Sequence, residues 1–428
     1  MTLILILVLF FGLIFAGAPI AYAMIGTSIV YFLTGPIPSL VEVVPHKMFE
    51  GVDVIVLTAI PFFLLAGNLM NRSGMADRLM NFADLIVGWA RGGLAQVNVL
   101  ASLLFSGLTG VAVGDIAALG KLEVAAMEKN GYTRPFAAAV TVASALVGPI
   151  IPPSGVIIFY CAIMQVSVGA MFLAAIIPGL MLAGADMLLI YIMSRVRNFP
   201  VSKRERTVGK IARSSVDASL AILMPVFLIG GIVGGVMTPT EAAAATVVYA
   251  VIVSTVVYRA LSVRDIWRIL SNSAFESARL IFLIAGALTM TWIFALEDLS
   301  GLLSGIFLIF GDSQIGFILS VNVLFLILGM FMEPGLAVIL FGPAIATIAY
   351  SFGITDVQLG IMLIVNVVVG LATPPIGNAL FAIAAVTNVK TGAVVRELLP
   401  FLFAKIVIIV LIGMVPALTN AIPDYFGF

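Results

Sequence analysis

The strongest constraint in this chain is a pair of adjacent prolines that occurs twice, each time inside a long apolar run. The first run reads Val-Gly-Pro-Ile-Ile-Pro-Pro-Ser-Gly over residues 147–155, and the second reads Val-Gly-Leu-Ala-Thr-Pro-Pro-Ile-Gly over residues 369–377. Two successive prolines remove two backbone donors and push the preceding residue out of the helical conformation. Each run is therefore predicted to be a membrane helix that is broken near its middle, where carbonyl groups are left free.

The two proline pairs belong to a longer internal repeat with a constant offset of 222 residues. At this offset Gly148 matches Gly370 and Gly155 matches Gly377. Interrupted membrane helices at matching places in two halves are typical of a secondary transporter, whose binding site lies where the repeats meet. A simple proline kink in each helix is the alternative interpretation, and the matching glycines favour the repeat.

The composition places the chain in a membrane. Hydrophobic residues make up 62% of it and charged residues 10%, whereas soluble domains carry about 25% charged residues. We therefore predict an all-α polytopic membrane protein. The single Cys161 excludes a disulfide within the chain, and the single His46 has no neighbours that would build a zinc site or a catalytic triad. A membrane enzyme needs a nucleophile with a base, or a metal cluster, at depth, so we expect neither an enzyme nor a bound cofactor.

Each half also contains a segment that is predicted to enter and leave the membrane on one side. Residues 94–130 hold two apolar arms around a Gly-rich tip at Gly107, and residues 323–350 repeat the pattern around Gly329. Each arm is shorter than the roughly 20 residues that a full span needs. We therefore predict two structural repeats, each with a re-entrant helical hairpin, a broken helix and one further span.

These patterns divide the chain into five regions. The regions are N-terminal scaffold helices at 1–93, the first hairpin, broken helix and span at 94–194, a basic loop at 195–214, scaffold helices with a short interfacial helix at 215–322, and the second hairpin, broken helix and last span at 323–428. The interfacial helix is predicted at 262–275 and spans at 302–322 and 391–421. The basic loop carries Glu205 as its single acidic residue among many cations, so the positive-inside rule places it in the cytoplasm.

Freed carbonyls beside small hydroxyls suit a hard cation such as sodium, which prefers oxygen ligands. In the first half the loop would present its carbonyls toward the hairpin tip, and the predicted ligands are Gly107, Thr109, Gly148, Ile151 and Pro153. In the second half the predicted ligands are Gly329, Gly370, Thr373 and Ile376. The alternative is that these glycines only allow helices to pack closely, as small residues do in membranes.

The half-helices that follow each broken loop begin with free N–H groups and a partial positive charge, which suit an anionic substrate. The residues at these positions are Ser154, Gly377 and Asn378, and Ser154 is equally well explained as a helix cap. Glu333 follows the second hairpin tip, and a carboxylate at membrane depth is usually functional. Asp115 is expected to cap a hairpin arm, and Arg279 is expected to extend its charge toward the interface.

The chain resembles the large membrane subunit of the tripartite ATP-independent periplasmic (TRAP) transporters, of the C4-dicarboxylate M type. The resemblance is carried by Gly110–Gly120, by Lys129-Asn130-Gly131-Tyr132, by Gly148-Pro149-Ile150-Ile151-Pro152-Pro153-Ser154, and by Gly370-Leu371-Ala372-Thr373-Pro374-Pro375-Ile376-Gly377. Two departures stand out. The family's first tip usually reads Ser-Gly-Ser where this chain has Thr109-Gly110-Val111, and its acidic residue after the second tip is commonly Asp where this chain has Glu333.

The residues at the half-helix starts and beside the second tip, Ser154, Gly377, Asn378 and Glu333, are the predicted substrate-binding residues. The resemblance implies an elevator-type, sodium-driven transporter of the bacterial inner membrane. It implies that the two sodium sites fall on the residues named above. It also implies two partners outside this chain, a small four-helix membrane subunit and a periplasmic binding protein that delivers a small organic anion, a dicarboxylate or a sugar acid. Membrane lipid is the other neighbour, and nucleic acid is not expected.

Two other functions remain open at the level of sequence. A stand-alone sodium/carboxylate symporter would show the same repeat but would need no binding protein. A purely structural assembly subunit is less well matched, because a scaffold has no use for carbonyl groups freed inside the membrane. The identity of the transported anion does not follow from the sequence.

Overall fold

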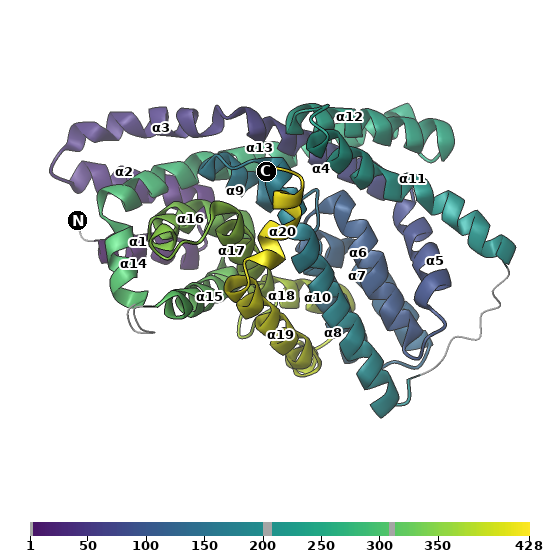
Figure 1. Ribbon diagram of the computed structural model, residues 1–428. Coiled ribbons are helices and arrows are strands. Elements are labelled where there is room, and N and C mark those ends of the chain that lie inside the picture. Colours follow the sequence, from purple (N-terminus) through teal and green to yellow (C-terminus); the bar gives the residue numbers. More distant parts are fainter. Residues whose placement is uncertain (1–2, 200–207, 308–312) are drawn as a thin grey trace.

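The computed structural model describes residues 3–199, 208–307 and 313–428, and these residues form helices and turns without a β-strand (Figure 1). Among the described residues, eight helices are long and apolar enough to cross a membrane. The predicted class, an all-α polytopic membrane protein, is therefore confirmed.

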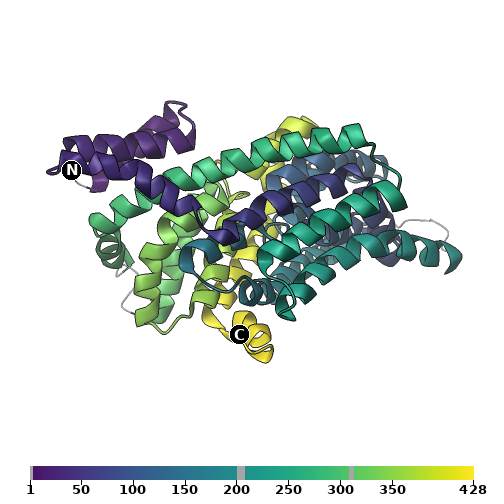
Figure 2. The same ribbon diagram turned by 90° about the horizontal axis from the view of Figure 1, so that it is seen from above.

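One group of helices comes from the N-terminal region and from the middle of the chain, and we call it the scaffold. It consists of α1 (Leu3–Phe15), α2 (Ile20–Thr34), η1 (Pro38–Glu42), α3 (Val43–Val52), η2 (Ile55–Thr58), α4 (Ala59–Arg72), α5 (Met75–Val87), α11 (Val208–Val233), α12 (Pro239–Ile252), the π-helical turn η3 (Val253–Val257), α13 (Val263–Leu296) and α14 (Leu299–Phe307). The long helix α13 packs against α2, α3 and α4. Seen from above, it runs along the molecule with the N-terminal helices at one end (Figure 2).

The second group contains the two repeats, and we call it the repeat body. The first repeat consists of α6 (Gly93–Thr109), α7 (Ala112–Lys129), α8 (Arg134–Ala145), α9 (Gly155–Met164) and α10 (Val168–Val196). The second consists of α15 (Gln314–Phe331), α16 (Pro334–Ser351), α17 (Asp356–Gly370), α18 (Asn378–Thr387) and α19 (Thr391–Met414), followed by α20 (Ala417–Tyr425). In each repeat two helices form a hairpin, two shorter ones form a broken helix, and a long helix completes the set.

The backbone conformation shows the same internal repeat as the sequence. Gly131 and Gly353, which are 222 residues apart, both have a positive φ and end the turns before α8 and α17. Gln165 and Asn388 end the short helices α9 and α18 in the left-handed conformation, with φ of 56° and 55°. The predicted breaks in the two apolar runs are confirmed, since α8 and α9, like α17 and α18, are separated by the proline-containing loops.

The two repeats interlock. The second arm of each hairpin packs on the short half-helix of the other repeat, so that α7 contacts α18 and α16 contacts α9. Glycines allow this approach: a Cβ atom on Gly335 of α16 would lie 2.4 Å from the ring of Phe159 on α9. A Cβ atom on Gly120 of α7 would lie 3.0 Å from Ile383 on α18. The helices α8, α10 and α17 then pack around α19, which joins both repeats into one core.

Several predicted boundaries were wrong. The segment 262–275 is no separate interfacial helix, because it is continuous with the following span in α13. A capping box between Ser262 and Asp265 starts this helix, and no proline interrupts it before Leu296. The span predicted at 391–421 is divided at Pro416 into α19 and α20.

The second hairpin also differs from its prediction. Its first arm begins at Gln314, so the boundary predicted at 322/323 falls inside α15, and α14 ends at Phe307. Residues 308–312 lie outside the described residues. Both α15 and α16 are long and apolar enough to cross a membrane, so arm length does not make this hairpin re-entrant. Of the predicted basic loop at 195–214, the ends belong to α10 and α11, and residues 200–207 lie outside the described part.

Candidate functional site

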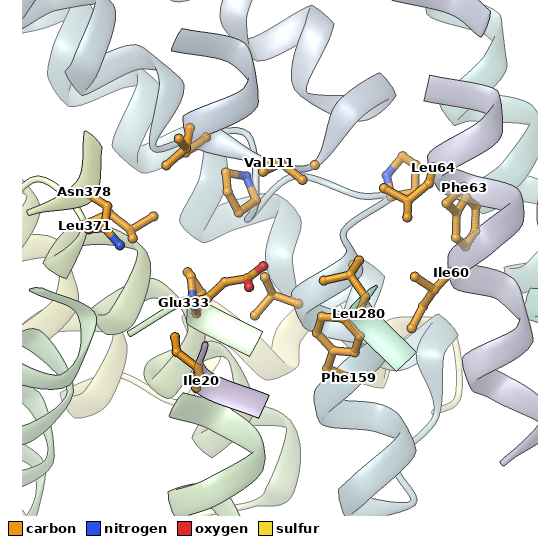
Figure 3. A pocket seen from close by; sticks show the side chains of 18 of the residues that line it. Ile20, Ile60, Phe63, Leu64, Val111, Phe159, Leu280, Glu333, Leu371 and Asn378 are labelled. Atoms are coloured by element: carbon orange, nitrogen blue, oxygen red, sulfur yellow. The ribbon is translucent and has the colours of Figure 1, made fainter. Parts of the chain in front are cut away.

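A cavity of about 410 Å³ lies where both hairpin tips and both broken loops face the scaffold (Figure 3). This volume is within the range of roughly 300–1,000 Å³ that is usual for small-molecule sites. Its walls are mainly apolar, with Ile60, Phe63 and Leu64 from α4, Phe159 from α9 and Leu280 from α13. The cavity therefore has the size and lining of a binding site for a small molecule.

Four helices of the repeat body begin at this cavity. The lining includes Ala112 of α7, Gly155 of α9, Pro334 of α16 and Asn378 of α18, each the first residue of its helix. Helix N-termini carry unpaired N–H groups and a partial positive charge. Their convergence favours an anion in the cavity, as predicted for the two half-helices and extended by the structure to both hairpin arms.

Glu333 points its carboxylate into the cavity (Figure 3). It occupies the N-cap position of α16, but its side chain makes no capping hydrogen bond. The side chain is half-buried, and no described residue forms an ion pair with it. The carboxylate is thus available to a substrate, on which it would accept hydrogen bonds from hydroxyl or amino groups.

Ser154 does not line the cavity. It is fully buried, its hydroxyl donates to the carbonyl of Pro149, and the same oxygen accepts from the backbone N–H of Ile157. The bond from the Ile157 N–H is the one that an N-cap residue makes, and Ser154 is the N-cap of α9. The structure therefore shows Ser154 as the cap of α9, and it is not among the residues that line the cavity.

Gly377 and Asn378 stand at the start of α18. Gly377 is buried and has φ of 47° and ψ of 100°, and a Cβ atom there would lie 2.8 Å from the carbonyl oxygen of Leu371. Glycine is thus required to shape the loop. Asn378 is exposed to the cavity, and its amide faces the space beside Leu371 (Figure 3).

The first broken loop contains the free carbonyls that a cation site needs. Among the described residues, none donates a hydrogen bond to the carbonyls of Gly148, Ile151 or Pro153. The first hairpin tip touches this loop, because a Cβ atom on Gly110 would lie 3.2 Å from the carbonyl oxygen of Pro153. Gly107 and Thr109 lie in the last turn of α6, and their side chains lie outside the described part.

The second broken loop is similar. No described residue donates to the carbonyls of Thr373 and Ile376, whereas the Gly370 carbonyl accepts from the backbone N–H of Thr373 at 2.9 Å. The Thr373 hydroxyl donates to the carbonyl of Val369 at 3.0 Å. Because its hydrogen is engaged there, its lone pairs remain available to a cation.

Gly329 and Gly370 are in direct backbone contact. A Cβ atom on Gly370 would lie 2.7 Å from the Cα of Gly329, and one on Gly329 would lie 2.3 Å from the carbonyl oxygen of Val367. Close helix packing, the alternative raised for these glycines, is therefore real at this pair. It does not exclude ligation, because Gly329 lies in the last turn of α15, where carbonyls are left without helical partners.

The structure adds residues that the sequence patterns did not select. A second cavity of about 380 Å³ shares Leu64, Val111, Leu280 and Glu333 with the first. Its polar residues other than Glu333 come from the scaffold and are Asn68, Asn71, Glu276 and Arg279. A cation inside an apolar run is costly, and that cost was the available signal for Arg279. The apolar residues of the cavity walls could not be selected from the sequence, because they do not differ from other lipid-facing or core residues.

Comparisons with known proteins show which family the chain belongs to. The family model for the tripartite ATP-independent periplasmic transporter, DctM component, matches residues 7–418. The chain belongs to this family. The sialic acid TRAP transporter large permease protein SiaM of Vibrio cholerae is 36% identical over 423 residues, which cover 97% of each chain. The C4-dicarboxylate TRAP transporter large permease protein DctM of Pseudomonas aeruginosa is 37% identical over 390 residues, which cover 91% of each chain.

A solved structure has a similar fold. The YdaH transporter of Alcanivorax borkumensis matches with a TM-score of 0.60 and 14% identity, covering 89% of each chain. The chain is thus a TRAP large permease for organic acid transport, a polytopic protein of the bacterial inner membrane and not an enzyme.

Proposed function

We propose that this TRAP large permease drives the import of a small organic anion with a sodium gradient, by an elevator movement, and in partnership with a small four-helix membrane subunit and a periplasmic binding protein. The observation that carries the proposal is the position of the two broken loops. The loops hold free carbonyls at Ile151, Pro153, Thr373 and Ile376, and they contribute Pro149, Pro153 and Leu371 to the lining of a cavity onto which four helix N-termini converge.

The arrangement separates the two charges that must bind. The C-terminal ends of α6 and α15, with their unpaired carbonyls, adjoin the loops and favour cations. The N-terminal ends of α7, α9, α16 and α18 face the cavity and favour the anion. Sodium on the loops would hold the hairpin tips in place, and a filled cavity would then depend on filled cation sites.

The packing supports an elevator movement. The repeat body is interlocked through α7 with α18 and α16 with α9, so it would move as one unit. Its contact with the scaffold runs mainly through α5 with α6 and α13 with α16. At the second of these interfaces, the Thr291 hydroxyl donates to the Ile339 carbonyl at 3.3 Å. The cavity lies at this boundary, with Ile60, Phe63 and Leu64 on the scaffold wall.

The cavity and the relatives support a proposal for the substrate class. One carboxylate would sit at the helix N-termini, and Glu333 would take hydroxyl or amino hydrogens, which favours a hydroxylated or aminated acid over a plain dicarboxylate. The relatives' names include sialic acid, a sugar acid, and C4-dicarboxylates. A sugar acid fits the carboxylate of Glu333 better than a C4-dicarboxylate does, because its hydroxyl groups can donate hydrogen bonds to that carboxylate.

The test is uptake in proteoliposomes that contain this chain with its small subunit, with the purified binding protein added outside. Labelled sialic acid and a labelled C4-dicarboxylate are offered with an inward sodium gradient, with equal sodium on both sides, and with potassium instead. Of these three conditions, we expect uptake only with the inward sodium gradient. Uptake that is indifferent to sodium would overturn the coupling, and equal uptake without binding protein would make the chain a stand-alone symporter.

A further inference from the structure

A carboxylic acid that the transport site does not use is buried inside the first hairpin. Glu123 of α7 is 5% exposed. Its Oε2 atom accepts hydrogen bonds from Asn98 Nδ2 of α6 at 3.0 Å and from Thr141 Oγ1 of α8 at 3.1 Å. No described residue bonds to its Oε1 atom, which is also shielded from solvent.

Among the described residues, no cation faces this carboxyl group. The helices α6 and α18, which pack on α7, contain no ionisable residue, and α8 contains only Arg134, which is 3.8 Å from Glu128. On α7 itself, Lys121, Glu128 and Lys129 are exposed, and Asp115 lies in the first turn, two turns before Glu123. The carboxyl group therefore has neutral neighbours only.

A buried carboxylate without a counter-charge is strongly disfavoured, and such a group takes up a proton instead. The hydrogen bonds fit this form. Both donors are directed at one oxygen, Oε2, as they would be at the carbonyl oxygen of a neutral acid, while Oε1 is left for the hydroxyl. We propose that Glu123 is a proton-binding site, held as a neutral carboxylic acid between α6, α7 and α8, whose proton leaves Oε1 for water at alkaline pH.

The site is connected to the first broken loop by hydrogen bonds. Asn98 Oδ1 accepts from Ser144 Oγ at 2.7 Å, and Ser102 Oγ contacts Ser144 Oγ at 3.1 Å. Ser144 is four residues, about one helical turn, before Gly148, where the loop carbonyls begin. Ionisation of Glu123 would reorient Asn98 and Ser144. A change in the protonation of Glu123 would thus alter the loop without any direct contact with the predicted ligands.

The second repeat provides an internal control. The position that matches Glu123 is Ile345, which is fully buried. The position that matches Ser144 is Asn366, whose amide donates to Asn322 Oδ1 at 2.8 Å. The second repeat thus has the same architecture with no acid at this position, so a hairpin of this kind packs without one. Its presence in one repeat makes the two halves respond differently to protons.

The direct test is infrared difference spectroscopy of the purified membrane protein across a pH titration. A protonated carboxylic acid has a carbonyl stretching band that a carboxylate lacks. We expect such a band at neutral pH, its loss at alkaline pH, and its absence in Glu123→Gln. The control Glu128→Gln, on the exposed end of the same helix, should keep the band. The presence of this infrared band does not depend on whether transport is coupled to sodium.

A second variant keeps the test valid if Glu123→Gln fails to fold. Thr141→Val removes one of the two donors on Oε2, so the band of the parent should shift to higher frequency and remain present. In uptake assays, the parent should lose transport as pH rises, and the pH profile of Glu123→Gln should be flat. Absence of a protonated band in the folded parent would overturn the proposal. Appearance of a sodium-dependent carboxylate band would assign the site to a metal cation instead and would also overturn it.

Discussion

Lys405 of α19 and Asp186 of α10 form an ion pair of 2.7 Å in which neither side chain is exposed to solvent. The pair joins the last long helices of the two repeats. Lys405 Nζ donates to Asp186 Oδ2, and Asp186 Oδ1 has no hydrogen-bond partner among the described residues. Such a pair is expensive to desolvate, but breaking it by removing one member is worse, because the other charge is left buried and unpaired.

The first prediction concerns this pair. Lys405→Met should destabilise the protein by about 3–5 kcal/mol, because it leaves Asp186 without a counter-charge. Adding Asp186→Leu should recover most of the loss. Thermal unfolding in detergent of the parent, the two single variants and the double variant gives the coupling energy. A Lys405→Met protein as stable as the parent would show that the pair is neutralised in another way.

The second prediction concerns the contact between Gly329 and Gly370. A Cβ atom on Gly329 has a backbone oxygen at 2.3 Å, which cannot yield as a side chain would. Gly329→Ala should therefore displace α15 from α17 and destabilise the protein by roughly 1–3 kcal/mol or more. Gly184→Ala on α10 is the control, since nothing lies within 4 Å of its Cβ position. Equal thermal stability of the two variants would contradict the close contact.

The third prediction concerns Thr373. Thr373→Val removes the hydroxyl whose hydrogen is bonded to Val369 and whose lone pairs face away from that bond. The sodium concentration for half-maximal uptake should rise. Thr347→Val is the control, because the exposed Thr347 hydroxyl bonds only within its own helix, to Ala344 at 2.8 Å. If both variants keep the parent's sodium response, Thr373 is not a ligand.

The fourth prediction concerns Glu333. Glu333→Gln keeps the size of the side chain and removes its charge from the cavity, so uptake should fall strongly while insertion and assembly with the small subunit persist. Glu128→Gln, on the exposed end of α7, should transport like the parent. Uptake is measured in proteoliposomes with a sodium gradient and binding protein present. Near-parental uptake by Glu333→Gln would remove this residue from the site.

The fifth prediction concerns orientation. In a protein whose Cys161 has been replaced, a cysteine at Ser202, in the basic segment outside the described residues, should not react with an impermeant thiol reagent added to intact cells. Asp424 of α20 is exposed, and α20 packs on α10 near Gly169, at the end of α10 opposite Arg195. A cysteine at Asp424 should therefore react. The reverse pattern would invert the topology.

The sequence predicted the repeat, the broken helices and the pairing of tips with loops, because proline and glycine act locally and their spacing is visible. The continuity of α13 was missed for the opposite reason. No proline or glycine separates 262–275 from the span that follows, and the capping box that starts α13 at Ser262 was not recognised.

The candidate site was predicted in part. Glu333, Gly377 and Asn378 could be selected because they stand at a helix start or beside a tip. Ser154 was equally consistent with two roles, and its burial and its bond from the Ile157 N–H show it as the cap. The scaffold wall at Phe63 and Leu280 depends on tertiary packing, which no local pattern encodes.

The interlocking of the repeats constrains how the protein can be made. The ribosome completes α7 at Lys129 long before it reaches Asn378, where the partner helix α18 begins. During that interval the small residues that receive α18, among them Gly120, lack the side chains of α18 that cover them. The first half must therefore wait in the membrane in an unfinished form, and a chain released early would expose that face to insertase, chaperone or protease. Quality control of this transporter would thus act on the completion of its second half.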